Sequence, residues 1–281
     1  MHDKSPLKVS TSNRSCDLAG DILTCDPDNP VSTEIPVIIV LQGNRFIIFP
    51  ASNTVPMEKK ITFAFLYILL FPALLLLLSG DFYWTEGWVF SLWFILLCYS
   101  TILYLYRKDP ALLEERYRQP GTGNQEGWDR YVVYGLLVGF VLWIVIMPLD
   151  AQRFGWSPLF PLWLKAAGGA GLTGSFFLFF RSYTDNTFLS PLVRIQQDRR
   201  QRVVSNGVYG FVRHPMYLGG ILMFLASPLL LGSIFGFLTG LALTALLMAR
   251  IQGEEMLLVR DLEGYREYTQ QVRYRLFPFL W

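Results

Sequence analysis

Long, uninterrupted apolar runs are the feature that most constrains how this chain can fold. A helix that crosses the ~30 Å hydrocarbon core of a bilayer needs about 20 mostly apolar residues. After residue 56 the 281-residue sequence repeatedly meets this requirement, and only 16% of its residues are charged, against about 25% in soluble domains. The predicted membrane helices are residues 61–79, 88–106, 131–148, 162–180, 217–231 and 235–248. The sequence therefore predicts an all-α, polytopic integral membrane protein with five to six transmembrane helices, whose first partner is the lipid bilayer.

The last two predicted helices come from one uncharged run, Met216–Met248, which is too long for a single span. Pro228, Gly232 and Gly236 interrupt this run, so we expect two short helices in a tight hairpin. After the hairpin, apolar residues recur at helical spacing on one face of residues 254–272, namely at Leu258, Leu262, Tyr265 and Val272. This pattern predicts a C-terminal amphipathic helix that lies on the cytoplasmic membrane surface.

Composition divides the chain into three regions. Residues 1–56 are rich in Ser, Thr, Asn, Asp and Pro, and we expect a disordered N-terminal extension or a stretch upstream of a true start at Met57. A small regulatory segment is the alternative. Within it, the apolar patch Ile35–Pro50 is interrupted by Gln42–Arg45, which predicts a turn between two short strands. Residues 57–183 hold the N-terminal transmembrane helices, and residues 184–281 hold the hairpin and the expected catalytic region.

Arginine and lysine concentrate in alternate connections between the predicted helices. They are frequent in residues 107–130, in residues 181–215 and after residue 249, whereas the intervening connections hold few. Because cytoplasmic loops carry the excess of basic residues, these three segments are predicted to be cytoplasmic. An active site formed by them would face the cytoplasm.

Several classes of site are excluded by residue counts. The chain has two histidines, His2 and His214, and three cysteines without CxxC spacing, so no multi-histidine metal site and no zinc ribbon can form within it. The formal net charge of +2 argues neither for nor against a nucleic-acid partner, and we expect none. The oligomeric state is left open by the sequence.

Three polar motifs flank the hairpin: Val203–Tyr209, Arg213–Tyr217 and Arg250–Glu255. A hairpin would bring the second and third motifs together on the cytoplasmic side. Taken one at a time, such residues can be interfacial anchors, a histidine at a helix start, or an i,i+4 salt bridge from Arg250 to Glu254. These alternatives leave unexplained why so many polar groups gather at the ends of one apolar hairpin, which favours a functional site.

The motifs VVSNGVYGFVRHPMYLGG, RIQGEEMLL and GYREYTQQVRYRLFPFLW resemble the isoprenylcysteine carboxyl methyltransferase family, and its bacterial members most. The resemblance implies a protein-S-isoprenylcysteine O-methyltransferase, an integral membrane enzyme with S-adenosyl-L-methionine as methyl donor and a lipophilic or prenylated acceptor. By the family pattern Arg250 would be catalytic and would face the acceptor carboxylate. The cofactor-binding residues would be Gln196, Gln201, Arg202, Val203, Val204, Tyr209, His214, Pro215, Met216, Tyr217 and Glu254.

The residue chemistry agrees with carboxyl methylation. The donor is cationic, so a carboxylate such as Glu254 suits it, and an acceptor carboxylate is already ionised at neutral pH. The transfer then needs orientation rather than a general base. Alternatives are a phospholipid (amine) N-methyltransferase, which shares the paired glutamates, and an NADPH-dependent sterol-type reductase, although Met216 stands where those reductases carry asparagine. A non-enzymatic membrane scaffold is a further alternative.

The basic-residue pattern yields a topology prediction. A cysteine introduced at Arg199 should resist labelling by a membrane-impermeant maleimide applied to intact cells, because residues 181–215 are expected in the cytoplasm. A cysteine introduced at Leu159, in the connection poor in basic residues, is the control that should be labelled. Efficient labelling at position 199 would contradict the predicted orientation.

Overall fold

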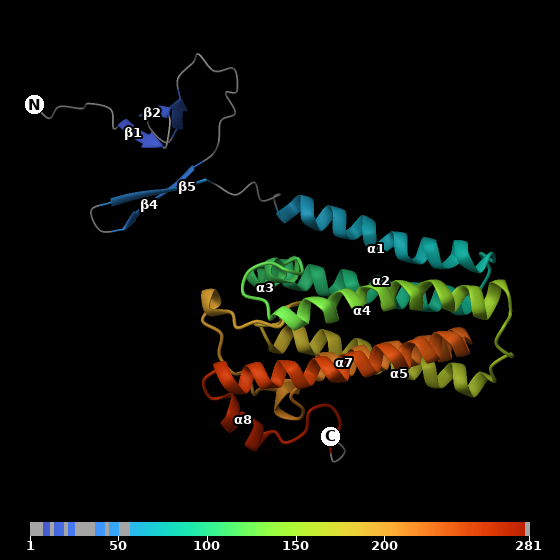
Figure 1. Cartoon of the computed structure of the whole chain (residues 1–281). Coiled ribbons are helices and arrows are strands. Elements are labelled where there is room, and N and C mark those ends of the chain that lie inside the picture. Colours follow the sequence, from blue (N-terminus) through green and yellow to red (C-terminus); the bar gives the residue numbers. More distant parts are fainter. Residues whose placement is uncertain are drawn as a thin grey trace, which may run out of the picture. The chain divides into compact units, whose positions relative to one another are not determined.

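The computed structural model describes the backbone of residues 57–278 and of five short strands within residues 8–50, and the side chains of residues 59–278. The chain divides into two compact units, Met1–Pro56 and Met57–Trp281. The larger unit contains all the α-helices of the described part, joined by loops, and every residue that the sequence singled out for function (Figure 1).

The smaller unit holds two antiparallel sheets. Strands β1 (Lys8–Thr11), β2 (Arg14–Ala19) and β3 (Ile22–Cys25) form one sheet, and β4 (Val37–Gln42) pairs with β5 (Arg45–Pro50) in the other. The two short strands predicted in the apolar patch are therefore confirmed, with Gln42 opposite Arg45. The rest of residues 1–56 lies outside the described residues, and the disordered extension stays a prediction.

Each of the six predicted membrane segments is helical in the larger unit. The first five helices are at most a few residues longer than predicted, whereas the last continues to Asp261 instead of ending at Met248. The elements are α1 (Met57–Ser79), α2 (Thr85–Lys108), the short α3 (Pro110–Arg116), α4 (Gly127–Pro148) with the π-helical turn η1 (Leu149–Arg153), α5 (Leu162–Asp185), α6 (Pro215–Leu231), α7 (Ile234–Asp261) and α8 (Tyr265–Gln271). The long helices α1, α2, α4, α5 and α7 run side by side in Figure 1. An integral, multi-pass membrane protein follows from their length and composition.

Four helices of the described part are long and apolar enough to cross a bilayer: Lys59–Ser79, Thr85–Lys108, Gly127–Arg153 and Ile234–Asp261. Helix α5 has a comparable length of 24 residues. Helix α6 has 17 residues, which rise roughly 26 Å at ~1.5 Å per residue, less than the ~30 Å hydrocarbon core. The count of five to six spans therefore stays a prediction, which depends on α5 and α6.

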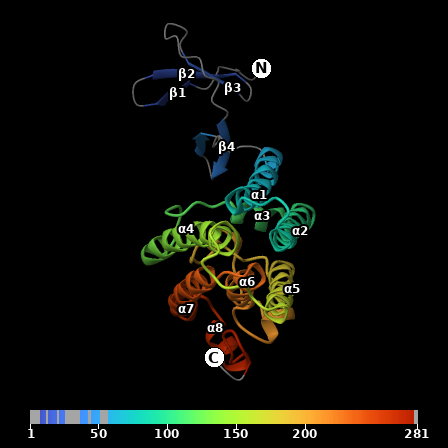
Figure 2. The ribbon, with the colours of Figure 1, turned by 90° about the vertical axis from the view of Figure 1, so that its right-hand side faces the viewer.

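Small residues let α6 pack closely between α5 and α7, as the end-on view shows (Figure 2). A Cβ atom on Gly168 of α5 would lie 2.4 Å from the backbone nitrogen of Leu230, and one on Gly240 of α7 would lie 2.3 Å from the carbonyl oxygen of Phe224. In a membrane, where apolar burial against lipid gains little, such close backbone contact is a main source of helix association. The glycines thus place α6 between α5 and α7 at close backbone distance.

The turn of the hairpin is held by polar groups at the end of the bundle away from the predicted site residues. Gly232 takes a φ of +83°, which a glycine adopts without strain, and ends α6. Ser233 then accepts a hydrogen bond from the backbone of Gly236 at 2.8 Å and caps α7. The Ser233 hydroxyl donates to the fully buried Asp150 at 2.6 Å, so η1 is fastened to the start of α7.

The predicted single helix over residues 254–272 is wrong in its bounds. Residues 254–261 are the last turns of α7, and Gly264 at φ +79° separates them from α8. The apolar face predicted to lie on the membrane is instead buried in the protein: Leu258, Leu262, Tyr265, Tyr268 and Val272 form a cluster against Ile195 and Val203. The sequence could not distinguish these outcomes, because a membrane and a neighbouring segment both cover an apolar face.

Two adjacent glycines of α5 provide a matched test of the close packing. Gly168→Ala should destabilise the protein by about 1–3 kcal/mol, because its new methyl group would overlap the backbone of α6. Gly169→Ala meets no atom within 4 Å and should be neutral or stabilising by up to ~1 kcal/mol, because alanine is favoured over glycine within helices. Thermal unfolding of both variants in detergent measures the difference, and equal melting temperatures would contradict the packing described here.

Candidate functional site

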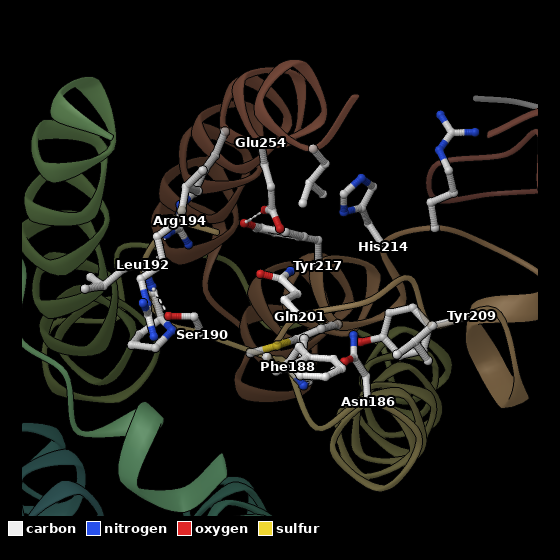
Figure 3. A pocket seen from close by; sticks show the side chains of 18 of the residues that line it. Asn186, Phe188, Ser190, Leu192, Arg194, Gln201, Tyr209, His214, Tyr217 and Glu254 are labelled. Carbon is white, nitrogen blue, oxygen red and sulfur yellow. Dashed lines mark hydrogen bonds between the residues drawn. The ribbon is translucent and has the colours of Figure 1, made fainter. Parts of the chain in front are cut away.

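A cavity of about 320 Å³ lies at the end of the bundle where α6 begins and α7 approaches its C-terminus. Its wall is completed by the 186–206 segment, which connects α5 to the region before α6 (Figure 3). The volume is within the roughly 300–1,000 Å³ range of ligand pockets. The predicted site residues that line it are Gln196, Gln201, Arg202, Val203, Val204, Tyr209, His214, Met216, Tyr217, Arg250 and Glu254.

Pro215 is the one predicted site residue that does not line this cavity. It occupies the first turn of α6 and is buried, where its fixed φ suits a helix start and its missing N–H costs no hydrogen bond. Its neighbours His214 and Tyr217 reach the cavity from the same helix start. Pro215 therefore starts α6 behind the cavity wall, and its contact with the cofactor stays a prediction.

Glu254 and Tyr217 both line the cavity and contact one another there. The Tyr217 hydroxyl donates to Glu254 Oε2 at 2.5 Å, and Figure 3 shows the two side chains meeting between α6 and α7. A carboxylate that accepts a short hydrogen bond keeps its remaining lone pairs for another donor. Glu254 can thus present negative charge to a cationic ligand while its position is held by the tyrosine.

Glu255, the next residue, points away from Glu254 and joins α7 to the C-terminal tail, the residues that follow α8. Its Oε1 accepts from Arg213 Nε at 2.6 Å and lies 3.2 Å from His214 Nε2, and its Oε2 accepts from Arg275 Nε at 2.6 Å. The tail also bonds through its backbone, since Arg213 N and His214 N donate to the carbonyls of Tyr274 and Arg275. Glu254 therefore faces the cavity, whereas Glu255 holds the C-terminal tail against α7.

Arg250 pairs with Asp129 of α4 rather than with Glu254. Its Nε donates to Asp129 Oδ1 at 2.7 Å, and its Nη2 reaches Asp129 Oδ2 at 3.3 Å and the carbonyl oxygen of Pro191 at 2.7 Å. Asp129 is fully buried and Arg250 is 8% exposed. The i,i+4 salt bridge considered for Arg250 and Glu254 is replaced by a pair between residues 121 positions apart.

The 186–206 segment is held against the bundle by a second buried ion pair. Arg194 donates to both oxygens of Glu115, at 2.8 and 2.7 Å, and Ser190 donates to Glu115 at 2.7 Å. Burial alone would raise the pKa of Glu115, but the hydrogen bonds from Arg194 and Ser190 outweigh it and leave the pKa below its usual value. Its contribution to stability is therefore present at neutral pH and is lost as the pH falls through the folded-state pKa.

The cavity has a polar and an apolar part. Asn186, Gln201 and His214 provide hydrogen-bonding groups, whereas Met223, Phe224 and Leu247 come from the apolar lengths of α6 and α7. Tyr265 and Tyr268 add the C-terminal wall. Burial raises the pKa of Tyr268 above its usual value, so its hydroxyl stays protonated and donates to the carbonyl oxygen of Tyr209 at 2.7 Å.

Sequence reasoning missed the residues that position the site. Asp129, Glu115 and Arg194 were not predicted to act there, and neither were Asn186 and Phe188, which line the cavity. The available signal was weak, because Asp129 and Glu115 lie outside the three motifs that flank the hairpin. Their partners lie 121 and 79 residues away along the chain, and no local pattern indicates such pairs.

The cavity coincides with the part of the chain that matches a known family. Residues 167–263 match a family model described as phospholipid methyltransferase, a range that contains α6, α7, most of α5 and the 186–206 segment. The match supports the resemblance seen in the sequence motifs and the class to which fold and site point, a membrane methyltransferase. A comparison with curated proteins finds no match.

Among solved structures, the chain is similar to the eukaryotic intramembrane Ras methyltransferase, isoprenylcysteine carboxyl methyltransferase. The identity is 18% and the TM-score 0.40, over 80% of this chain and 88% of that chain. Because this similarity is too low to transfer residue roles, we assign roles from the geometry of the cavity.

The position of Glu255 generates a stability prediction. Glu255→Gln should cost on the order of 3 kcal/mol, because it leaves buried cationic partners without their counter-charge. The exposed Glu263 is the matched control, and Glu263→Gln should change stability by less than about 0.5 kcal/mol. Thermal unfolding in detergent compares the two. A melting temperature of Glu255→Gln equal to that of the control would show that the tail is held by other contacts.

Proposed function

We propose that this protein is an S-adenosylmethionine-dependent methyltransferase that esterifies a carboxylate of a lipophilic acceptor, most like an isoprenylcysteine. The observation that carries the proposal is the joint lining of one cavity by Glu254 and Arg250, one helical turn apart on α7. One residue offers a carboxylate for a cationic donor and the other offers N–H groups for an anionic acceptor. In the proposed topology this cavity faces the cytoplasm.

The polar part of the cavity fits the donor by its chemistry. Glu254 would hold the ammonium group, with Tyr217 fixing the orientation of its carboxylate. Asn186, Gln201 and His214 offer amide and imidazole groups for the ribose and adenine, and the neighbouring tyrosines offer apolar faces. When bound, S-adenosylmethionine supplies an electrophilic methyl group on a cationic sulfonium.

The remaining parts of the cavity fit the acceptor. Arg250 would orient an acceptor carboxylate, which is ionised at neutral pH and needs no base to attack. Met223, Phe224 and Leu247 would contact the lipophilic chain where α6 and α7 enter the membrane. The enzyme's contribution is then to align two bound reactants and exclude water, a source of large rate enhancement.

Methylation of a lipid amine is the second candidate, and two observations favour it. The matched family model is described by phospholipid methylation, and the Tyr217–Glu254 pair could receive the proton that an ammonium acceptor must lose. A carboxylate acceptor needs no such proton transfer. Turnover of a prenylcysteine analogue against turnover of phosphatidylethanolamine in the same detergent distinguishes the two.

Substitutions of Glu254 and Arg250 should affect donor binding and methyl transfer separately. Glu254→Gln removes the charge opposite the donor's ammonium, and a hydrogen bond to a charged group contributes roughly 1.5–3 kcal/mol. Donor affinity should therefore fall by about one to two orders of magnitude. Arg250→Lys keeps the charge but loses the planar guanidinium, so it should leave donor binding nearly unchanged and slow the transfer.

Calorimetry with S-adenosylmethionine measures donor binding, and turnover of N-acetyl-S-farnesylcysteine measures transfer. Glu263→Gln again serves as the control, because Glu263 is exposed and does not line the cavity. If Glu254→Gln and Arg250→Lys both bind the donor as the parent does and turn over the acceptor at the parent rate, the assignment of this cavity is wrong.

A further inference from the structure

Asp129 holds Arg250 in one orientation, and we propose that this makes Asp129 a positioning residue for the acceptor. Asp129 accepts hydrogen bonds from Nε and Nη2 of Arg250. A single nitrogen, Nη1, is then presented to the acceptor carboxylate. The inference rests on the proposed function, because it assigns Arg250 to the acceptor.

Three residues of the protein donate to the carboxylate of Asp129. Its Oδ1 accepts from Arg250 Nε at 2.7 Å. Its Oδ2 is within hydrogen-bonding distance of Arg250 Nη2 at 3.3 Å, Val193 N at 2.8 Å and Gln125 Nε2 at 2.7 Å. Asp129 is fully buried, so it does not touch a ligand itself. It acts through Arg250 and through the backbone of the cavity wall.

The bonds of Arg250 define which part of the guanidinium is left for a ligand. A guanidinium carries five N–H donors, and three are used: Nε–H and one Nη2–H on Asp129, and the other Nη2–H on the Pro191 carbonyl. The two N–H groups of Nη1 take no part in these bonds. A carboxylate acceptor would meet Nη1 alone, because Nε and Nη2 are already occupied by the protein.

The same aspartate also sets the cavity wall in register with Arg250. Val193 N bonds to Asp129 Oδ2, and Pro191 O bonds to Arg250 Nη2. Two residues of the 186–206 segment are thus fastened to the two members of the ion pair. Rotation of the guanidinium would break the contact with the wall, so the pair and the wall hold one another in a single arrangement.

The charge balance of the pair predicts how the kinetic constants should separate. In the parent, Asp129 neutralises the charge of Arg250. Arg250 then acts on the acceptor carboxylate mainly as an oriented hydrogen-bond donor. Asp129→Asn leaves the positive charge of Arg250 uncompensated but loosens its orientation. The variant should attract an anionic acceptor at least as strongly as before, while the bound carboxylate is poorly aligned for methyl transfer.

A double-mutant cycle tests the proposal on the full chain purified in detergent. With N-acetyl-S-farnesylcysteine as acceptor, Asp129→Asn should lower kcat on the order of tenfold to a hundredfold, the usual effect of misalignment, without raising KM for the acceptor. In the Arg250→Lys background the same substitution should lower kcat by less than about threefold, because its effect passes through the guanidinium. Donor affinity, measured by calorimetry, should stay within about threefold of the parent.

Glu115→Gln is the matched control, since it removes another buried carboxylate that bonds to the same wall through Arg194 and not to Arg250. Its effect on kcat should multiply independently with that of Arg250→Lys. Thermal unfolding of the ligand-free protein gives a readout separate from activity: the combined Asp129→Asn and Arg250→Lys loss in melting temperature should be smaller than the sum of the single losses.

Three outcomes have distinct meanings. The positioning role would be overturned if Asp129→Asn raised the acceptor KM and left kcat unchanged. It would also be overturned if the effects of Asp129→Asn and Arg250→Lys on kcat multiplied independently. Additive losses in melting temperature would show that the two residues are not coupled in the folded protein, and would overturn it as well. A parent that neither binds S-adenosylmethionine nor turns over the acceptor would overturn the proposed function, while the melting cycle still reports on the ion pair.

Discussion

A buried ion pair between Asp129 and Arg250 joins the parts of the chain that make the cavity. The charges come from α4 and α7, and each member also bonds to the backbone of the 186–206 segment. Because an unpaired charge in an apolar interior is strongly unfavourable, neither residue can leave the other without cost. The helices and the wall are therefore held in one arrangement at the point where a cavity opens between them.

The two consecutive glutamates of α7 show how one helix serves binding and folding together. Successive side chains on a helix point in directions about 100° apart, so Glu254 faces the cavity while Glu255 faces the C-terminal tail. Glu254 meets Tyr217, and Glu255 gathers Arg213, His214 and Arg275. The cluster around Glu255 fixes the start of α6, and that helix start carries His214 and Tyr217 into the cavity.

Close packing of α6 between its neighbours lets a polar site form at the end of an apolar hairpin. The glycines of α5 and α7 bring the backbones together, and the serine hydroxyl of Ser175 donates to the Gly219 carbonyl at 2.8 Å within this contact. Such a contact is hard to deform, because backbone atoms rather than flexible side chains meet there.

The helical membrane architecture was determined by the sequence alone, because the length and composition of an apolar run are local properties that the bilayer itself constrains. All six predicted helices are present, and ten of the eleven predicted cofactor residues line the cavity together with Arg250. Motif residues near the two ends of a hairpin are brought together by its connectivity, which the sequence also displays.

Only the tertiary structure decided what those residues contact. It assigned Arg250 to Asp129 and Arg194 to Glu115, separated α7 from α8 at Gly264, and buried the apolar face of residues 258–272 against Val203. Pairing between charges depends on which helices are neighbours, and an apolar face carries no record of whether lipid or protein will cover it. Both are settled by the packing of distant segments, a property that no local pattern along the chain contains.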